Sequence, residues 1–158
     1  MEVVVSDSTS IMTLLRIDRL DILSHIFQTV YLPPVVYAEI SHKTTLDSSH
    51  SLFTIMPIAD TALYTLLTRS LDAGESEAIV LAKERGLSLI IDEKKGRKIA
   101  SNLGINITGL LGLLLLNHKK GFLTVSEILA LFSEIQDAGF YVSERLVVMF
   151  ESALKEGK

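Results

Sequence analysis

Short runs of β-branched and other apolar residues alternate along the chain with longer stretches in which apolar residues recur at helical spacing. The first run, Val3 to Val5, is uniformly apolar and therefore predicts a strand that is buried on both faces. Similar runs predict further strands over residues 30–32, 53–57, 87–92 and 105–107. Because strands and helical patterns alternate, the sequence predicts an α/β domain with a small parallel sheet, rather than a helical bundle or a sandwich.

Apolar spacing and capping signals predict the helices between these strands. Pro33 and Pro34 suit the first turn of a helix, Asp60 is a candidate N-cap, and Gly86 suits the position that closes a helix. The segment from His42 to Ser51 is polar and predicts an exposed, mobile loop. We predict helices over residues 11–15, 20–27, 33–41, 60–71, 75–85, 94–103, 109–119, 125–137 and 143–156.

The last three predicted helices have no strand between them. This helical C-terminal part either covers an edge of the sheet or forms a lobe that binds a partner. Its last helix carries an apolar stripe made of Leu146, Val147, Phe150 and Leu154. The stripe can simply fill the core. We predict that apolar surface here or on the first helices supports a homodimer or binds a small partner protein.

Composition agrees with one globular domain over residues 1–158. The chain of 158 residues is 48% hydrophobic, which excludes intrinsic disorder. It has 15 basic and 19 acidic residues and a net charge of −4, so it does not bind nucleic acid through bulk positive charge. The absence of cysteine excludes disulfides, thiolate zinc sites and cysteine nucleophiles.

No segment of the sequence has the pattern of a signal peptide or of a membrane span. The N-terminal residues lack a basic region followed by a long apolar stretch. The most apolar run, Gly109 to Leu116, is much shorter than the roughly 18 residues that a spanning helix needs. We therefore expect a cytoplasmic protein that does not associate with a membrane.

Four acidic residues occupy positions at which acids are uncommon. Asp7 and Asp92 end predicted strands, and ligands of parallel sheets bind beyond the carboxyl ends of the strands. Glu39 and Glu75 share helix faces with apolar residues that should pack on the core. Because clustered carboxylates repel one another, the set indicates a hard divalent cation with oxygen ligands, Mg²⁺ or Mn²⁺.

Three of these acids also have an ordinary structural interpretation. Asp7 can cap the helix that follows it, although Ser10 is a better candidate for that cap. Glu75 can be a surface residue whose charge matches the helix dipole, and Glu39 can pair with a lysine. Only the four acids taken together favour a metal site.

Five stretches of the sequence, in this order, resemble the PIN-domain nucleases and especially their VapC-like toxin branch. They cover nearly the whole chain. They are VVSDST (4–9), LPPVVYAEI (32–40), LDAGESEAI (71–79), LIIDE (89–93) followed by GR (96–97), and GINITG (104–109). More specifically, the chain looks like a prokaryotic PIN-like group.

The resemblance implies a PIN-like three-layer α/β/α fold and metal-dependent hydrolysis of RNA phosphodiester bonds. It also implies a homodimer and a small antitoxin protein as partner. The acids that it places at the metal and catalytic positions are Asp7, Glu39, Glu75 and Asp92.

Two of these positions have a competitor. Glu77 competes with Glu75, which itself stands where the toxins commonly have Asp. Glu93 competes with Asp92, because comparison with a VapC pattern without gaps favours Glu93 whereas the strand-end position favours Asp92. The first strand-end acid, Asp7, has no competitor.

Neighbouring polar residues have candidate supporting roles. Ser8 or Thr9 can orient Asp7 or a water bound to the metal, or they can simply begin the next helix. Four cations follow Asp92 directly and can bind RNA phosphates beside the metal site, or they can form a solvated helix face. They are Lys94, Lys95, Arg97 and Lys98.

The leading hypothesis is a Mg²⁺- or Mn²⁺-dependent endoribonuclease, the toxin of a toxin–antitoxin pair. The alternative is a catalytically weak PIN-like module that binds RNA or protein. A third interpretation, an aspartyl-phosphate phosphotransferase, requires a second acid two residues after Asp7, where this chain has Thr9.

Overall fold

The computed structural model describes residues 2–44, 46 and 52–156, and it confirms the parallel α/β architecture. Within these residues five strands form one sheet in the order β3-β2-β1-β4-β5, and every pairing is parallel. The strands are β1 (Glu2–Ser6), β2 (Phe27–Leu32), β3 (Phe53–Ile55), β4 (Ser88–Ile90) and β5 (Ile107–Thr108).

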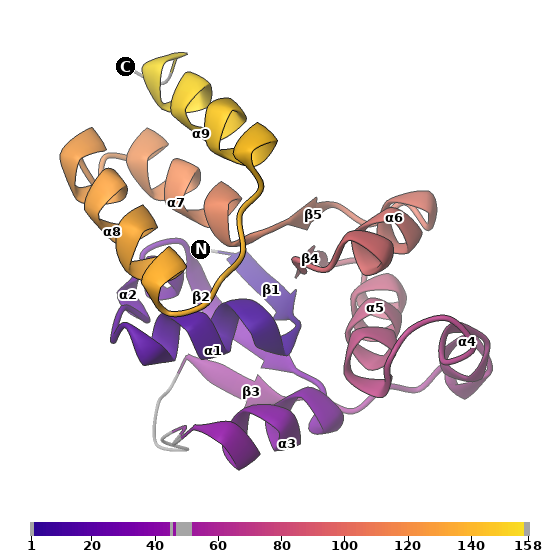
Figure 1. Cartoon of the computed structure of the whole chain (residues 1–158). Coiled ribbons are helices and arrows are strands. Elements are labelled where there is room, and N and C mark those ends of the chain that lie inside the picture. The colour runs from indigo at the N-terminus through magenta and orange to yellow at the C-terminus, as the bar shows by residue number, and fades with distance from the viewer. Residues whose placement is uncertain (1, 45, 47–51, 157–158) are drawn as a thin grey trace.

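Helices cover both faces of this sheet, which gives the expected three layers. Figure 1 shows α5 and α6 on one side and α1, α2 and α7 on the other. The helices are α1 (Ser8–Arg16), α2 (Asp21–Ser24), α3 (Pro34–Lys43), α4 (Thr61–Leu67), α5 (Ala73–Arg85), α6 (Lys94–Asn102), α7 (Leu110–Lys119), α8 (Val125–Asp137) and α9 (Glu144–Glu156). Val4 and Val5 in the central strand are fully buried, as a strand covered on both faces requires.

Local signals placed most helix ends correctly. Asp60 accepts a hydrogen bond from the N–H of Leu63 at 3.0 Å and so caps α4. α3 begins at Pro34, and α5 ends at Arg85 with Gly86, whose φ is 63°, as its C-cap. Of the expected loop at 42–51, residues 42 and 43 belong to α3, whereas residues 45 and 47–51 lie outside the described residues.

Several elements differ in extent from the sequence-based expectation; α4, for example, ends at Leu67 and not near residue 71. Two of the differences have a clear cause. The helix expected over residues 20–27 ends at Ser24, because Phe27 already begins β2 and pairs with Glu2 of β1. The strand expected over 105–107 begins only at Ile107, because the N–H of Ile105 bonds back to the carbonyl of Ala100 at 3.1 Å and closes α6. In both places the apolar spacing suited either type of element, and long-range pairing decided between them.

The C-terminal helices pack together on the side of the sheet that carries α2. α7 contacts α2, and α8 and α9 pack against α7. The rings of Phe132 in α8 and Phe150 in α9 stack with centroids 5.0 Å apart. None of the described helices combines the length and the apolar composition that crossing a membrane would require.

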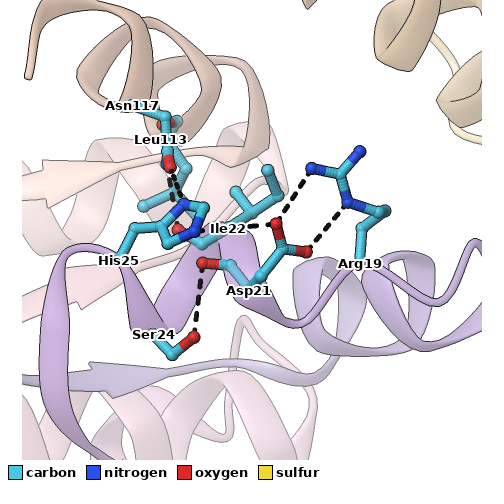
Figure 2. Close-up of polar contacts among 7 residues, drawn as sticks. All are labelled: Arg19, Asp21, Ile22, Ser24, His25, Leu113 and Asn117. Carbon is cyan, nitrogen blue, oxygen red and sulfur yellow. Dashed lines mark hydrogen bonds and ion pairs between the residues drawn. The ribbon is translucent and has the colours of Figure 1, made fainter. Parts of the chain in front are cut away.

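A buried asparagine joins α2 to α7, as Figure 2 shows. The Nδ2 of Asn117 donates to the carbonyl of Ile22 at 2.9 Å and to that of Leu113 at 2.8 Å. Its Oδ1 lies 2.8 Å from the Nδ1 of His25. Because the amide nitrogen faces two carbonyls, Oδ1 is the acceptor and His25 Nδ1 carries the hydrogen.

The same network extends to the surface through Asp21. Arg19 donates to both carboxylate oxygens of Asp21, each at 2.9 Å, and His25 Nε2 lies 3.8 Å from the same carboxylate. The His25 ring also stacks on Phe122 with centroids 4.6 Å apart. Every side chain in this network therefore has a partner of complementary kind.

Candidate active site

The carboxyl ends of β1 and β4 form the point at which the strand order reverses. β2 and β3 lie on one side of β1, and β4 and β5 lie on the other. Ser6 pairs with Ile90, and the N–H of Asp7 donates to the carbonyl of Ile90 at 2.9 Å. Asp7 and Asp92 therefore follow two neighbouring strands at the switch point, where open parallel sheets bind their ligands.

Asp7 is a buried carboxyl group, and the charged groups that shift its pKa are all acids. It precedes α1, but its side chain makes no capping hydrogen bond, so the helix-cap interpretation is wrong. Burial raises the pKa of Asp7 from 3.8 to about 7, against the lowering effect of the Ser8 N–H. The charges of Asp72, Glu39 and Asp92 raise the pKa further.

Glu39 reaches the same region from α3. Its Oε2 accepts a hydrogen bond from Ser8 Oγ at 3.2 Å, and its Oε1 lies against the first turn of α5. A Cβ atom at position 74 would lie only 2.0 Å from that oxygen, so Gly74 is what allows the close approach. Burial raises the pKa of Glu39; the bond from Ser8 opposes this shift and the charge of Asp72 adds to it.

Glu75 extends from the first turn of α5 toward the N-terminus of α6. Its side chain is buried, and Oε2 has no hydrogen-bond partner among the described residues. A Cβ at Gly96 would lie 2.9 Å from this oxygen, so the glycine again permits the approach. Burial raises the pKa of Glu75 to about 9, and the carboxylates of Asp72 and Glu93 add to the effect.

The surroundings of Glu75 have a direct chemical consequence. Its polar neighbours, Asp72 and Glu93, are carboxylates, which accept hydrogen bonds when ionised and donate none. A proton on Glu75 or a cation bound beside it would therefore satisfy Oε2.

Glu77, the competitor of Glu75, points elsewhere. Its Oε1 accepts a hydrogen bond from the N–H of Val35 at 2.9 Å, in the first turn of α3. The residue thus joins α5 to the N-terminus of α3, where backbone N–H groups lack partners within the helix. Of the two glutamates, Glu75 is the one that lies among the other acids.

Asp92 and Glu93 both lie at the site but in different environments. Asp92 Oδ2 accepts a hydrogen bond from Ser10 Oγ, and Oδ1 accepts one from the N–H of Leu110 at 2.9 Å. Burial raises its pKa although these donors oppose the shift. Glu93 is exposed and caps α6 through the N–H of Gly96 at 2.7 Å, which lowers its pKa. The choice between Asp92 and Glu93 as metal ligand stays a prediction.

Asp72 is a member of the cluster that we did not predict from the sequence. It is exposed and caps α5 through the N–H of Glu75 at 2.8 Å. Its charge raises the pKa of Asp7, Glu39 and Glu75. An acid three residues before Glu75 has the spacing of an N-cap, and this signal could have revealed it.

The supporting hydroxyl groups differ from those expected. We expected Ser8 or Thr9 to orient Asp7, but Ser8 donates to Glu39 instead. Thr9 is exposed, and its carbonyl accepts a bond from Thr13 Oγ1 at 3.0 Å. Ser10, predicted only as a helix cap, is the residue that holds Asp92.

The four expected RNA-binding cations divide into two groups. Lys94, Lys95 and Lys98 are exposed on α6. Arg97 is partly buried, and its Nη1 donates to the carbonyl of Ile91 at 2.9 Å, next to Asp92. Arg97 therefore has a structural contact, whereas the lysines can meet a ligand in solvent.

The chemistry of this site suits a hard divalent cation, although the side chains are not gathered around one ion position. Within the described part of the chain, no group of three or more Asp, Glu or His residues has the arrangement of a ready metal site. Three observations nevertheless fit a cation: donors that are all oxygen, raised pKa values, and the buried Glu75 oxygen without a partner.

Comparison with known proteins gives one family match. The matching family model is DUF3368, described as a PIN domain, and it covers residues 3–156. A PilT N-terminus domain protein, SSO1118, from the hyperthermophilic archaeon Sulfolobus solfataricus P2 is a similar solved structure. It shares 20% identity and a TM-score of 0.44, over 72% of this chain and 90% of that chain. No curated protein matches the chain significantly.

Proposed function

The chain belongs to the PIN domain family, and we propose that it is a metal-dependent ribonuclease that hydrolyses RNA phosphodiester bonds. PIN domains are generally nucleases and typically depend on a divalent metal. One observation supports this function above the others: carboxyl groups from four separate segments converge at the switch point of the sheet with their pKa values raised.

In this proposal Asp7, Glu39, Glu75 and Asp92 hold Mg²⁺ or Mn²⁺. A bound cation supplies polarisation of the phosphate and a more acidic attacking water. Ser8 and Ser10 hold Glu39 and Asp92 in place through their hydroxyl groups. The exposed lysines of α6 contribute local attraction for the RNA backbone in a chain that is acidic overall.

The test compares wild type with Asp7→Asn, which removes one charge at nearly constant shape. Added Mn²⁺ should raise the melting temperature of wild type, and its free energy of unfolding should increase by about 2.7 kcal/mol at a hundredfold excess over the dissociation constant. It should also cut a structured RNA. Asp7→Asn should lose both effects, whereas Asp137→Asn, at an exposed position of α8, should keep them.

A wild-type protein that neither shifts its melting temperature nor cuts RNA with Mn²⁺ present would contradict the nuclease proposal. The second candidate is then a PIN-like module that binds RNA or protein without cleaving. The absence of a ready three-ligand group among the described residues is the observation that favours it. Such a module would bind RNA equally well with and without Mn²⁺.

We further propose a homodimer and a small antitoxin protein as partners. Large apolar side chains are exposed on the C-terminal helices: Leu129, Leu146, Val148 and Met149. Phe150 and Leu154 of the predicted stripe are buried in the core, so the surface is smaller than the sequence suggested. Light scattering at high micromolar concentration checks the dimer, and a purely monomeric protein would contradict it.

A further inference from the structure

The segment between α8 and α9 passes beside the acidic cluster. Gly139 has a φ of 99° and turns the chain after the last residues of α8. Figure 1 shows the connection running past α1 to reach α9. Phe140 is partly buried, but the next residue, Tyr141, is 83% exposed. No other exposed large hydrophobic side chain in the described part of the chain reaches this fraction.

Tyr141 borders a cavity that shares residues with the candidate active site. The cavity measures about 330 Å³ and lies between one face of α1, the segment after β4 and the α8–α9 connection. That volume falls near the lower end of the roughly 300–1,000 Å³ typical of small-ligand sites. The lining residues that matter here are Thr9, Thr13, Arg16, Asp92, Glu93 and Tyr141.

We propose that this cavity holds one base of the RNA substrate, stacked on the ring of Tyr141. The inference rests on the proposed function, because the nucleotide next to the reacting phosphate must lie beside Asp92 and Glu93. A base is flat and uncharged, so it can lie next to carboxylates without repulsion. Aromatic rings bind bases of single-stranded RNA in this way, with little dependence on sequence.

The other polar groups of the cavity suit a nucleotide. Arg16 is exposed at the end of α1, where its guanidinium can meet a phosphate. The hydroxyl of Thr9 comes from an exposed residue and can meet the edge of a base or a ribose hydroxyl. Arg16, Thr13 and Thr9 recur at helical spacing, so one face of α1 presents all three.

A second cavity lies on the other side of the connection and has a different character. It measures about 420 Å³ and runs between α7 and α9, with Leu111, Leu146 and Met149 among its apolar lining. Tyr141 and Asp92 border both cavities. The polar cavity with Arg16 is the one that suits RNA, and Met149, which borders only the apolar cavity, distinguishes the two.

The experiment measures binding and cleavage of a fluorescent single-stranded RNA oligonucleotide by the full chain. Binding is measured with Ca²⁺ and cleavage with Mn²⁺. Tyr141→Ala should weaken binding by about five- to 150-fold, the effect of losing one stacked base. Tyr141→Phe keeps the ring and should bind like wild type. Val148→Ala, on α9 but outside both cavities, is the matched control, and Met149→Ala tests the apolar cavity alone.

Oligonucleotides that lack one base provide a second measurement. When the missing base belongs to the nucleotide that would occupy the cavity, the oligonucleotide should bind wild type more weakly than the intact RNA does. Its binding to Tyr141→Ala should not be weakened further. The melting temperatures of all variants should match that of wild type, because Tyr141, Val148 and Met149 are exposed. A variant Tyr141→Ala that folds and binds RNA as tightly as wild type would overturn the inference.

The outcomes also separate this inference from the proposed function. Cleavage by wild type with no dependence on Tyr141 would overturn the base site alone. RNA binding that depends on Tyr141 without any cleavage would support the base site and contradict the nuclease. Loss of RNA binding in Met149→Ala but not in Tyr141→Ala would place the RNA in the apolar cavity and overturn the inference.

Discussion

The acidic cluster at the switch point and the Asn117 network between α2 and α7 are two polar regions with opposite chemistry. Both join segments that are far apart in the sequence, and both contain buried polar groups. In the network, each donor of Asn117 meets a carbonyl and its acceptor meets the ring of His25 (Figure 2). In the cluster, carboxylates face other carboxylates, and Glu75 Oε2 has no partner among the described residues.

This difference separates a structural site from a candidate ligand site. Buried polar groups stabilise a fold when they are satisfied, and they cost free energy when they are not. The network is complete without a ligand, so it holds the C-terminal helices to the sheet domain. The cluster is incomplete in the protein alone, and such an arrangement is typical of positions that bind a ligand.

The largest expected change in stability comes from substitutions in the Asn117 network, where every buried polar group has a partner. Asn117→Ala should lower the free energy of unfolding by about 3–4 kcal/mol, because it leaves buried polar groups without partners and opens a small cavity. Asn117→Asp keeps the size but cannot donate to two carbonyls, so it should also be destabilised. Denaturant unfolding at pH 7 measures both, with Asn102→Ala at an exposed position of α6 as control. Stability of Asn117→Ala close to wild type would contradict the structural role.

A smaller effect, a gain in stability, is expected from a substitution in the acidic cluster. The pKa of Asp7 is about 7 in the folded protein against 3.8 as its ordinary value, so the folded state binds more protons between these pH values. The contribution of Asp7 to stability therefore falls as the pH rises from about 4 to about 7 and stays level above. Asp7→Asn removes this loss and should be more stable than wild type at pH 8, without divalent cations, by about 2–3 kcal/mol, a part of the roughly 4 kcal/mol to which the full pKa difference corresponds.

The measurement is denaturant unfolding at pH 5 and pH 8 in the presence of a chelator. The gain of Asp7→Asn over wild type should be larger at pH 8 than at pH 5. Wild type should still lose stability above pH 7, because the pKa of Glu75 is raised to about 9. Asp137→Asn, at an exposed residue, should show no such gain. A gain that is the same at both pH values would mean that the ionisation of Asp7 does not limit stability.

The sequence was sufficient to predict the order of strands and helices and the positions of the main acids relative to them. Asp7 and Asp92 follow β1 and β4, and Glu39 and Glu75 lie on helices, as their spacing indicated. These features follow from local causes. Uninterrupted apolar runs, apolar residues at a period of 3.6 and caps such as Asp60 act within short segments of the chain.

Contacts between distant segments were decided only by the tertiary structure. Because α3 packs against α5, Glu77 accepts a hydrogen bond from the N–H of Val35, whereas Glu75 lies among the other acids. Ser10 and Asp92, 82 residues apart in the chain, meet because β1 and β4 are neighbours in the sheet.

Asp72 and Tyr141 show the same limit at the candidate site. Each lies at the start of a helix or in a connection, where the local pattern indicates a turn and nothing more. Their position beside the acidic cluster depends on how α5 and the C-terminal helices pack on the sheet. The periodicity of a sequence encodes which face of an element is buried, but the partner that buries it depends on the arrangement of the whole fold.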